Sequence, residues 1–325
     1  MNPVRERVLE VNGIRLNVTE QGDGPLVLLL HGFPETSHAW RHQRSALAAA
    51  GYRAVAPDLR GYGRSECPGD FAAYTTLDVV GDLVALVELL GERRAVVAGG
   101  DWGATIAWQA AQLRPDRFRA VLALGVPLMP RPPMPPSKLF PQTAATRFYT
   151  HYFEEPGIAE RELELDIAMT LRKIYFAASG DAGPRDEAST PNPFGMVARA
   201  AGLLDALPDP ARLPDWLDPA DLAAFIAGFA ASGFSGGLNY YRNLDRNWAL
   251  QAAFEGMKVT VPAYYLVGER DTGRAVPGMD SMVAAMPILA PRLRGSEVVA
   301  GAGHWLQQEA PGAVNAALLG FLAGL

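Results

Sequence analysis

The stretch VVAGGDWGATIAW, residues 96–108, decides the fold of this chain. Its first residues are apolar or small, as in the end of a buried strand, and the apolar residues after Asp101 recur at helical spacing. Between these two parts, GGDWG at 99–103 allows a very sharp turn. Glycines two residues on either side of Asp101 suit such a turn, because larger side chains there would clash. Asp101 would then stand at a helix N-terminus, where peptide N–H groups stabilise negative charge.

Two interpretations of Asp101 follow from this stretch alone. A strand, a sharp turn and a helix with a reactive side chain at the tip form a nucleophile elbow, in which many hydrolases carry serine. Aspartate is also a favoured helix N-cap residue. The stretch by itself leaves both interpretations open.

Apolar runs on both sides of the elbow predict a mostly parallel sheet. Four short runs that end in Gly or Pro lie at 25–32, 52–61, 93–100 and 118–127, separated by helix-length amphipathic segments. Strands buried on both faces by crossover helices have this pattern. Before them, Asn12-Gly13 between two β-rich runs predicts an antiparallel hairpin.

The pattern is interrupted after residue 127. A proline-rich linker at 127–141 precedes a segment, about 137–250, that is predicted to be mostly helical without a convincing strand. Strand-like runs return at 259–271 and 296–305, and a helix closes the chain. We therefore expect an α/β core at 1–130 and 252–325, with a helical cap domain at 131–251.

Composition narrows the possible partners. With 49% hydrophobic and 20% charged residues, the 325-residue chain has the composition of a folded globular protein. A net charge of −6 and the lack of a Lys/Arg block argue against nucleic acid as a partner. The longest apolar runs are too short to span a bilayer, so no integral membrane segment is expected. The single cysteine and an N-terminus without a signal-peptide pattern indicate a cytoplasmic location.

Residues far from Asp101 favour the nucleophile interpretation. The strand at 26–30 leads into HGFP at 31–34, the position of the oxyanion loop in α/β-hydrolases. The backbone N–H groups of Phe33 and Trp102 would form a two-donor oxyanion hole.

The downstream motifs supply an acid and a base. Asp271 follows a strand in YYLVGERD, and His304 lies in the glycine-rich loop GAGHW, so nucleophile, acid and histidine come in the order of an α/β-hydrolase triad. Asp280 is the competing acid, although its surroundings suggest a solvated helix position. Of the other histidines, His31 is expected to be structural at the end of its strand, and His38 and His42 lie at the polar start of a helix. His151 lies in the helical insertion.

An aspartate nucleophile restricts the substrate. Attack by aspartate on a saturated carbon leaves an ester, and a water activated by His304 can hydrolyse that ester. An epoxide or an alkyl halide is therefore expected. An opening epoxide becomes an alkoxide, which needs a proton or a strong hydrogen bond, and tyrosines in the helical segment could provide it.

The motifs together resemble one family, the epoxide hydrolases of the α/β-hydrolase fold, in particular soluble bacterial ones. The resemblance covers nearly the whole chain and rests on HGFPE, DLRGYGRS, GGDWGA, FYTHYFEEPG, LNYYRNLDRNW and GAGHW. It implies a mostly parallel central sheet flanked by helices, with an inserted helical cap (lid). It also implies that Tyr149 and Tyr241 are the paired proton donors, with Tyr152 and Tyr240 beside them.

The resemblance carries further expectations. No metal or organic cofactor is required, the substrate is an apolar or aromatic epoxide with water as co-substrate, and a homodimer is possible. Substrate contacts are expected from His31, Pro34, Trp102, Tyr152 and Trp305.

The sequence departs from the family pattern at three places, and two other functions remain as alternatives. Gly100 stands where relatives often have His, Tyr240 where many have Trp, and Thr272-Gly273-Arg274 is unusual after the acid. A haloalkane dehalogenase would use the same nucleophile and a Trp after it, but Phe33 replaces the Asn that commonly binds halide there. A noncatalytic ligand-binding protein on the hydrolase fold is the other alternative, although it would be expected to lack a triad residue.

Overall fold

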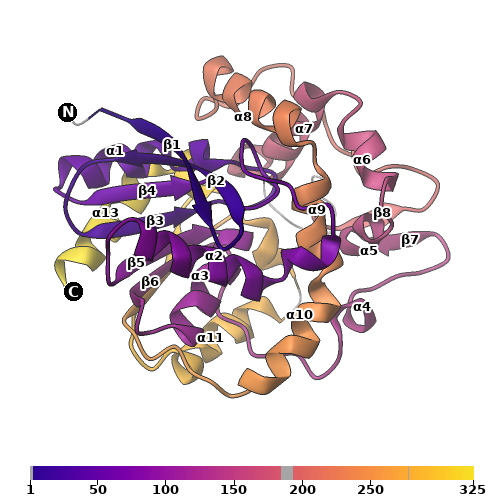
Figure 1. Cartoon of the computed structure of the whole chain (residues 1–325). Coiled ribbons are helices and arrows are strands. Elements are labelled where there is room, and N and C mark those ends of the chain that lie inside the picture. Colours follow the sequence, from indigo (N-terminus) through magenta and orange to yellow (C-terminus); the bar gives the residue numbers. More distant parts are fainter. Residues whose placement is uncertain (1–2, 184–192, 277) are drawn as a thin grey trace.

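The computed structural model describes residues 3–183, 193–276 and 278–325. Its main element is an eight-stranded sheet in the order β1-β2-β4-β3-β5-β6-β9-β10 (Figure 1). The strands are β1 (Arg5–Val11), β2 (Ile14–Gln21), β3 (Leu26–Leu30), β4 (Arg53–Pro57), β5 (Ala95–Gly100), β6 (Phe118–Leu124), β9 (Ala263–Gly268) and β10 (Leu293–Val299). Within this sheet only the β1/β2 and β2/β4 pairs are antiparallel. The predicted mostly parallel sheet and the hairpin at Asn12-Gly13 are confirmed.

Helices cover the sheet on both sides because its central strands are apolar throughout. Every residue of β3 and β5 is buried. Helix α1 packs on α13, and α2 packs on α3. The elements of the core are η1 (Ser37–Trp40), α1 (Arg41–Ala49), η2 (Phe71–Tyr74), α2 (Thr76–Leu89), α3 (Trp102–Leu113), η5 (Thr272–Ala275), α11 (Met279–Leu289), α12 (Leu306–Glu309) and α13 (Pro311–Ala323).

A helical insertion connects β6 to β9. Figure 1 shows it in pink to orange at one end of the sheet, opposite the two chain termini. Its described elements are α4 (Pro136–Leu139), β7 (Thr146–Phe148), α5 (Tyr149–Glu154), α6 (Ile158–Leu163), α7 (Ile167–Ala178), η3 (Gly180–Ala182), β8 (Met196–Ala198), α8 (Pro219–Ser232), α9 (Ser235–Arg242), α10 (Leu244–Leu250) and η4 (Gln251–Phe254).

Two details of the insertion differ from the sequence expectation. Strands β7 and β8 pair antiparallel, so the segment expected to lack strands contains a small sheet. The proline-rich linker contains the short helix α4, which begins at Pro136. Proline is compatible with a first helical turn, where its missing N–H would have no partner anyway.

Hydrogen bonds join the insertion to the core loops at the carboxyl ends of the strands. The Tyr175 hydroxyl of α7 donates to the carbonyl oxygen of Pro34, at 2.7 Å. The His304 backbone N–H donates to the carbonyl oxygen of Ala178, at 3.0 Å. The insertion therefore lies over the edge of the sheet at which the predicted functional residues meet.

No single helix in the described ranges is long and apolar enough to cross a membrane. Helices α8 and α9 pass that test only when taken together, and the chain bends by 76° between them.

Candidate active site

The elbow holds Asp101 in a strained backbone conformation. Asp101 has φ 54° and ψ −122° between β5 and α3, a region that costs a non-glycine residue about 1–3 kcal/mol. Close backbone packing leaves no room for neighbouring side chains: a Cβ on Gly99 would strike the Gly103 carbonyl, and one on Gly103 would strike the Leu30 carbonyl. Likewise, a Cβ on Gly32 would collide with the side chain of Asp101. The glycines therefore permit the turn that presents this carboxylate.

His304 lies between two carboxylates. Its Nδ1 is 3.2 Å from each carboxylate oxygen of Asp271, and its Nε2 is 3.4 Å from Oδ2 of Asp101. The Asp271 side chain is 1% exposed and also accepts a hydrogen bond from the Gly273 N–H at 2.7 Å. The structure thus brings together the three residues that the sequence analysis assigned to a triad, in the order carboxylate, imidazole, carboxylate.

The two carboxylates control the charge of His304. Burial disfavours the imidazolium, but the negative charges of Asp271 and Asp101, together with the hydrogen bond to Asp271, outweigh burial and raise the pKa of His304 well above its usual value. Loss of either negative charge would therefore lower this pKa.

One predicted oxyanion-hole donor already contacts the nucleophile. The Phe33 N–H donates to Oδ1 of Asp101 at 2.8 Å, which leaves Oδ2 as the oxygen nearer to His304. Trp102, the other predicted donor, is the first residue of α3 and directly follows Asp101.

Tyr149 and Tyr241 meet across the site. Tyr149 begins α5, Tyr241 lies in α9, and their ring centroids are 5.6 Å apart at an interplanar angle of 79°. Burial, and secondarily the charge of Asp101, raises the pKa of each hydroxyl above its usual value. Both phenols are therefore neutral O–H donors near the Asp101 carboxylate.

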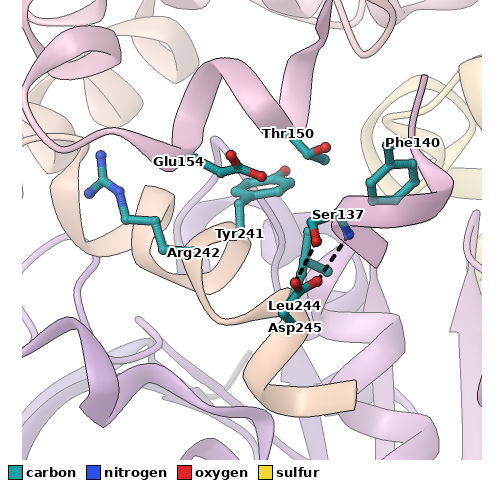
Figure 2. Close-up of a pocket in the computed structure, with 8 residues that line it drawn as sticks. All are labelled: Ser137, Phe140, Thr150, Glu154, Tyr241, Arg242, Leu244 and Asp245. Atoms are coloured by element: carbon teal, nitrogen blue, oxygen red, sulfur yellow. Dashed lines mark hydrogen bonds between the residues drawn. The ribbon is translucent and has the colours of Figure 1, made fainter. Parts of the chain in front are cut away.

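A cavity of about 290 Å³ borders Tyr241 within the insertion. Figure 2 shows Tyr241 beside Thr150 and Glu154 of α5, while the backbone N–H of Ser137 donates to the Asp245 carboxylate at 2.9 Å. The ring of Tyr241 also packs on Trp102, with centroids 5.2 Å apart, so Tyr241 contacts both this cavity and the residue that follows the nucleophile.

Two of the residues predicted to contact substrate have their polar atoms engaged elsewhere. The Leu59 N–H donates to His31 Nε2 at 3.0 Å, and His31 Nδ1 lies 2.9 Å from the Gly32 carbonyl oxygen. The Tyr152 hydroxyl donates to Glu162 at 2.6 Å. These contacts hold the local structure, and the structure does not bring either polar group to the Asp101 carboxylate.

Pro34 and Trp305 lie where the core meets α7. The Trp305 indole N–H donates to the Tyr175 carbonyl oxygen at 2.9 Å, and its ring packs edge-on against His304 with centroids 4.8 Å apart. The Pro34 carbonyl accepts from the hydroxyl of the same tyrosine.

The unusual stretch after the acid contacts Asp271 through the Gly273 N–H, whereas the Arg274 side chain binds other groups. The Arg274 guanidinium donates to the Glu269 carbonyl oxygen at 3.3 Å and lies 3.8 Å from the Asp280 carboxylate. The Asp280 side chain is 85% exposed in the first turn of α11, as expected for a solvated position.

Sequence reasoning did not identify several residues that surround this site. Phe153 packs on Tyr241, with ring centroids 5.0 Å apart, and Phe194 packs on His304 at 5.5 Å. Glu309 accepts hydrogen bonds from the backbone on either side of His304. Phe153 belongs to the FYTHYFEEPG motif and could have been found there, whereas the sequence gives no signal for the other two. In the described part of the chain, no cluster of His, Cys, Asp and Glu could hold a metal ion.

Comparison with known proteins identifies the family. Residues 25–311 match the family model described as the alpha/beta hydrolase fold. The chain is 44% identical to epoxide hydrolase A of Mycobacterium tuberculosis, over 100% of this chain and 99% of that protein. It is 41% identical to an epoxide hydrolase of Caballeronia sordidicola, covering 98% of this chain and 94% of that one.

Solved structures agree with this assignment. An epoxide hydrolase from an endophytic Streptomyces superposes with a TM-score of 0.92 at 42% identity, covering 99% of this chain and 96% of that one. The fold class and the family resemblance predicted from the motifs are thereby confirmed. The chain belongs to the epoxide hydrolases of the α/β-hydrolase fold.

Proposed function

We propose that this protein hydrolyses epoxides to vicinal diols through a covalent ester on Asp101. The observation that carries the proposal is the environment of one carboxylate: Oδ1 accepts the Phe33 N–H, and Oδ2 lies 3.4 Å from the His304 imidazole. One oxygen can therefore attack while the other is already placed to become the carbonyl oxygen of an ester.

In the first step, Oδ2 of Asp101 attacks an epoxide carbon and the carbon–oxygen bond of the ring breaks. Tyr149 and Tyr241 donate hydrogen bonds to the departing oxygen, and one of them transfers its proton, so that this oxygen becomes a hydroxyl. The tyrosinate regains a proton after the second step, in which His304 takes one from water. Burial raises the pKa of both hydroxyls above its usual value, so each phenol keeps the proton that such a bond requires.

In the second step, His304 removes a proton from water and the resulting hydroxide attacks the ester carbonyl. The Phe33 and Trp102 N–H groups stabilise the oxyanion of the tetrahedral intermediate, which collapses to the diol and the Asp101 carboxylate. Asp271 orients the imidazole and stabilises its positive charge.

Electrostatics favours this order of steps. The Asp101 charge helps to raise the pKa of His304, and ester formation neutralises that charge. The pKa of His304 therefore falls once the ester exists, and the neutral imidazole needed as a base becomes more populated.

The walls of the site support an apolar or aromatic epoxide. The rings of Phe33, Phe153 and Phe194 surround the tyrosine pair, with centroids 5.0–5.8 Å from a neighbouring ring of the site. We further propose that residues 131–251 form the cap domain, that the protein forms a homodimer and that it is located in the cytoplasm. His31, Pro34, Tyr152 and Trp305 are the proposed substrate contacts.

The decisive experiment is the intact mass of His304→Gln after incubation with separate epoxides and alkyl halides. Blocked water activation should trap the ester, with a mass gain equal to a whole epoxide on the peptide that contains Asp101. Asp101→Ala, the matched control, should gain no mass and form no diol. A gain equal to an alkyl group without its halogen would indicate a dehalogenase, and diol formation by Asp101→Ala would refute the mechanism.

A further inference from the structure

The carboxylate of Glu309 binds three peptide N–H groups and lies next to the catalytic loop. Glu309 is the last residue of α12. Its Oε2 accepts from the N–H groups of Gly303 at 2.7 Å and Gly180 at 2.8 Å, and its Oε1 accepts from that of Trp305 at 2.8 Å. Two of these donors flank His304 in the chain, and the third belongs to the insertion.

The same loop is fixed to the end of α7 by other contacts. The His304 N–H donates to the carbonyl oxygen of Ala178 at 3.0 Å. From the neighbouring loop that carries Asp271, the Arg270 guanidinium donates to the carbonyl oxygen of Gly180 at 2.8 Å. Gly303 lies so close to this turn that a Cβ there would strike the backbone of residues 178–180. Small changes in the loop would therefore displace His304 relative to Asp101.

We infer that Glu309 is a positioning residue for His304, which fixes the base loop to the insertion so that the imidazole can activate water. The inference rests on the proposed function. It predicts that Glu309 acts on ester hydrolysis and has little effect on ester formation, because its carboxylate accepts from Gly180, Gly303 and Trp305 and, in the described residues, forms no hydrogen bond with the elbow, Phe33 or the two tyrosines.

Only an ionised carboxylate matches this set of donors. Both oxygens of a carboxylate accept, and in the described residues no Lys or Arg side chain forms an ion pair with Glu309. In Glu309→Gln, one oxygen becomes an NH₂ group that faces at least one peptide N–H. At least one of the three hydrogen bonds is then lost, and two donors oppose each other.

The environment of the carboxylate agrees with a structural anchor. Loss of hydration raises the pKa of Glu309 to about 7, although the three peptide N–H groups work against this rise. Without these hydrogen bonds the pKa would rise further, so the three peptide N–H groups favour the ionised form of the buried carboxylate.

The test is single-turnover kinetics of Glu309→Gln with styrene oxide, with intact mass to measure the ester fraction. We expect ester hydrolysis to slow about tenfold or more and ester formation to change less than about threefold, since small displacements of a catalytic group have effects of this size. Ester should therefore accumulate during turnover. Glu88→Gln, a change of the same kind at a side chain 78% exposed at the end of α2, is the matched control and should behave as wild type.

Glu309→Asp keeps the charge but is one methylene shorter, and it provides the second variant if Glu309→Gln does not fold. It should fold and show the same selective loss to a smaller degree. Ester hydrolysis within twofold of wild type in a folded variant would overturn the inference, as would an equal loss in both steps. Failure of the proposed function would be distinct, because His304→Gln itself would then trap no ester.

Discussion

Replacing the two site tyrosines by phenylalanine, singly and together, tests how the epoxide ring opens. Tyr149 packs between Phe153 and Phe194, with centroids 5.6 Å and 5.4 Å away, and Tyr241 packs against Trp102. Phenylalanine preserves these ring contacts and removes only the hydroxyl. The substitutions therefore isolate the hydrogen bonds to the leaving oxygen.

The size of the effect follows from the charge on that oxygen. A hydrogen bond to a charged group contributes about 1.5–3 kcal/mol, so loss of one hydroxyl should slow ester formation roughly 10- to 150-fold. Both hydroxyls address the same oxygen, so the remaining one partly compensates in each single variant. Loss of both should slow ester formation roughly 10²- to 10⁴-fold, with a double-mutant coupling that shows compensation.

The assay is the rate of ester formation in a single turnover, followed by the fluorescence of Trp102 beside the nucleophile or by rapid quench and intact mass. Tyr240→Phe is the matched control: it is a neighbour in α9, but its hydroxyl donates to the Arg60 carbonyl at 3.0 Å. That variant should lose about 1 kcal/mol of stability and retain the rate of ester formation. Wild-type ester formation by the Tyr149/Tyr241 double variant would refute the reasoning.

Two further variants probe the carboxylates around His304. Asp271→Ala should slow ester hydrolysis on the order of 10³-fold or more, because the imidazole loses its orienting partner, and should leave ester formation largely intact; a mass spectrum without accumulated ester during turnover would contradict this. In Glu35, burial raises the pKa from 4.5 to about 7, so its stabilising contribution is full below the unfolded pKa and is lost as pH rises through about 7. Urea unfolding should therefore show that the stability difference between wild type and Glu35→Gln shrinks from about pH 5 to about pH 8, and a constant or growing difference would exclude this assignment.

Local sequence patterns were sufficient to predict most of the core. The hairpin turn at Asn12-Gly13, the apolar strands and the elbow depend on neighbouring residues, which a short window of sequence contains. The strands β7 and β8 have only three residues each, and Val197 is their one buried side chain, so they are too short to show a period-2 pattern in the sequence. The order of the eight strands was not predicted, because it depends on how distant segments pair.

The site was only partly predictable, for a related reason. Asp101 and His304 stand in glycine-rich turns whose local composition marks them, and the tyrosine pair came from the family resemblance. Glu309 and Gly180 are hydrogen-bonded although 129 residues apart in the chain. Nothing near either residue in the sequence indicates this contact, since it exists only after the insertion has packed on the core.

Four carboxylates lie near His304, and their roles differ because their hydrogen-bond partners differ, not because of their residue type. Asp101 keeps one oxygen free of peptide donors and toward His304, as a nucleophile requires. Asp271 faces the other imidazole nitrogen and is fixed by Gly273. Both oxygens of Glu309 accept from peptide N–H groups. Glu35 accepts on Oε1 from the side-chain amides of Gln307 and Gln308, at 2.8 Å and 2.7 Å, and on Oε2 from the Gly32 N–H at 3.4 Å. Because the last two carboxylates have no free oxygen directed at substrate or imidazole, substitution there should alter the position of His304 or the stability of the fold, whereas substitution of Asp101 removes the reaction itself.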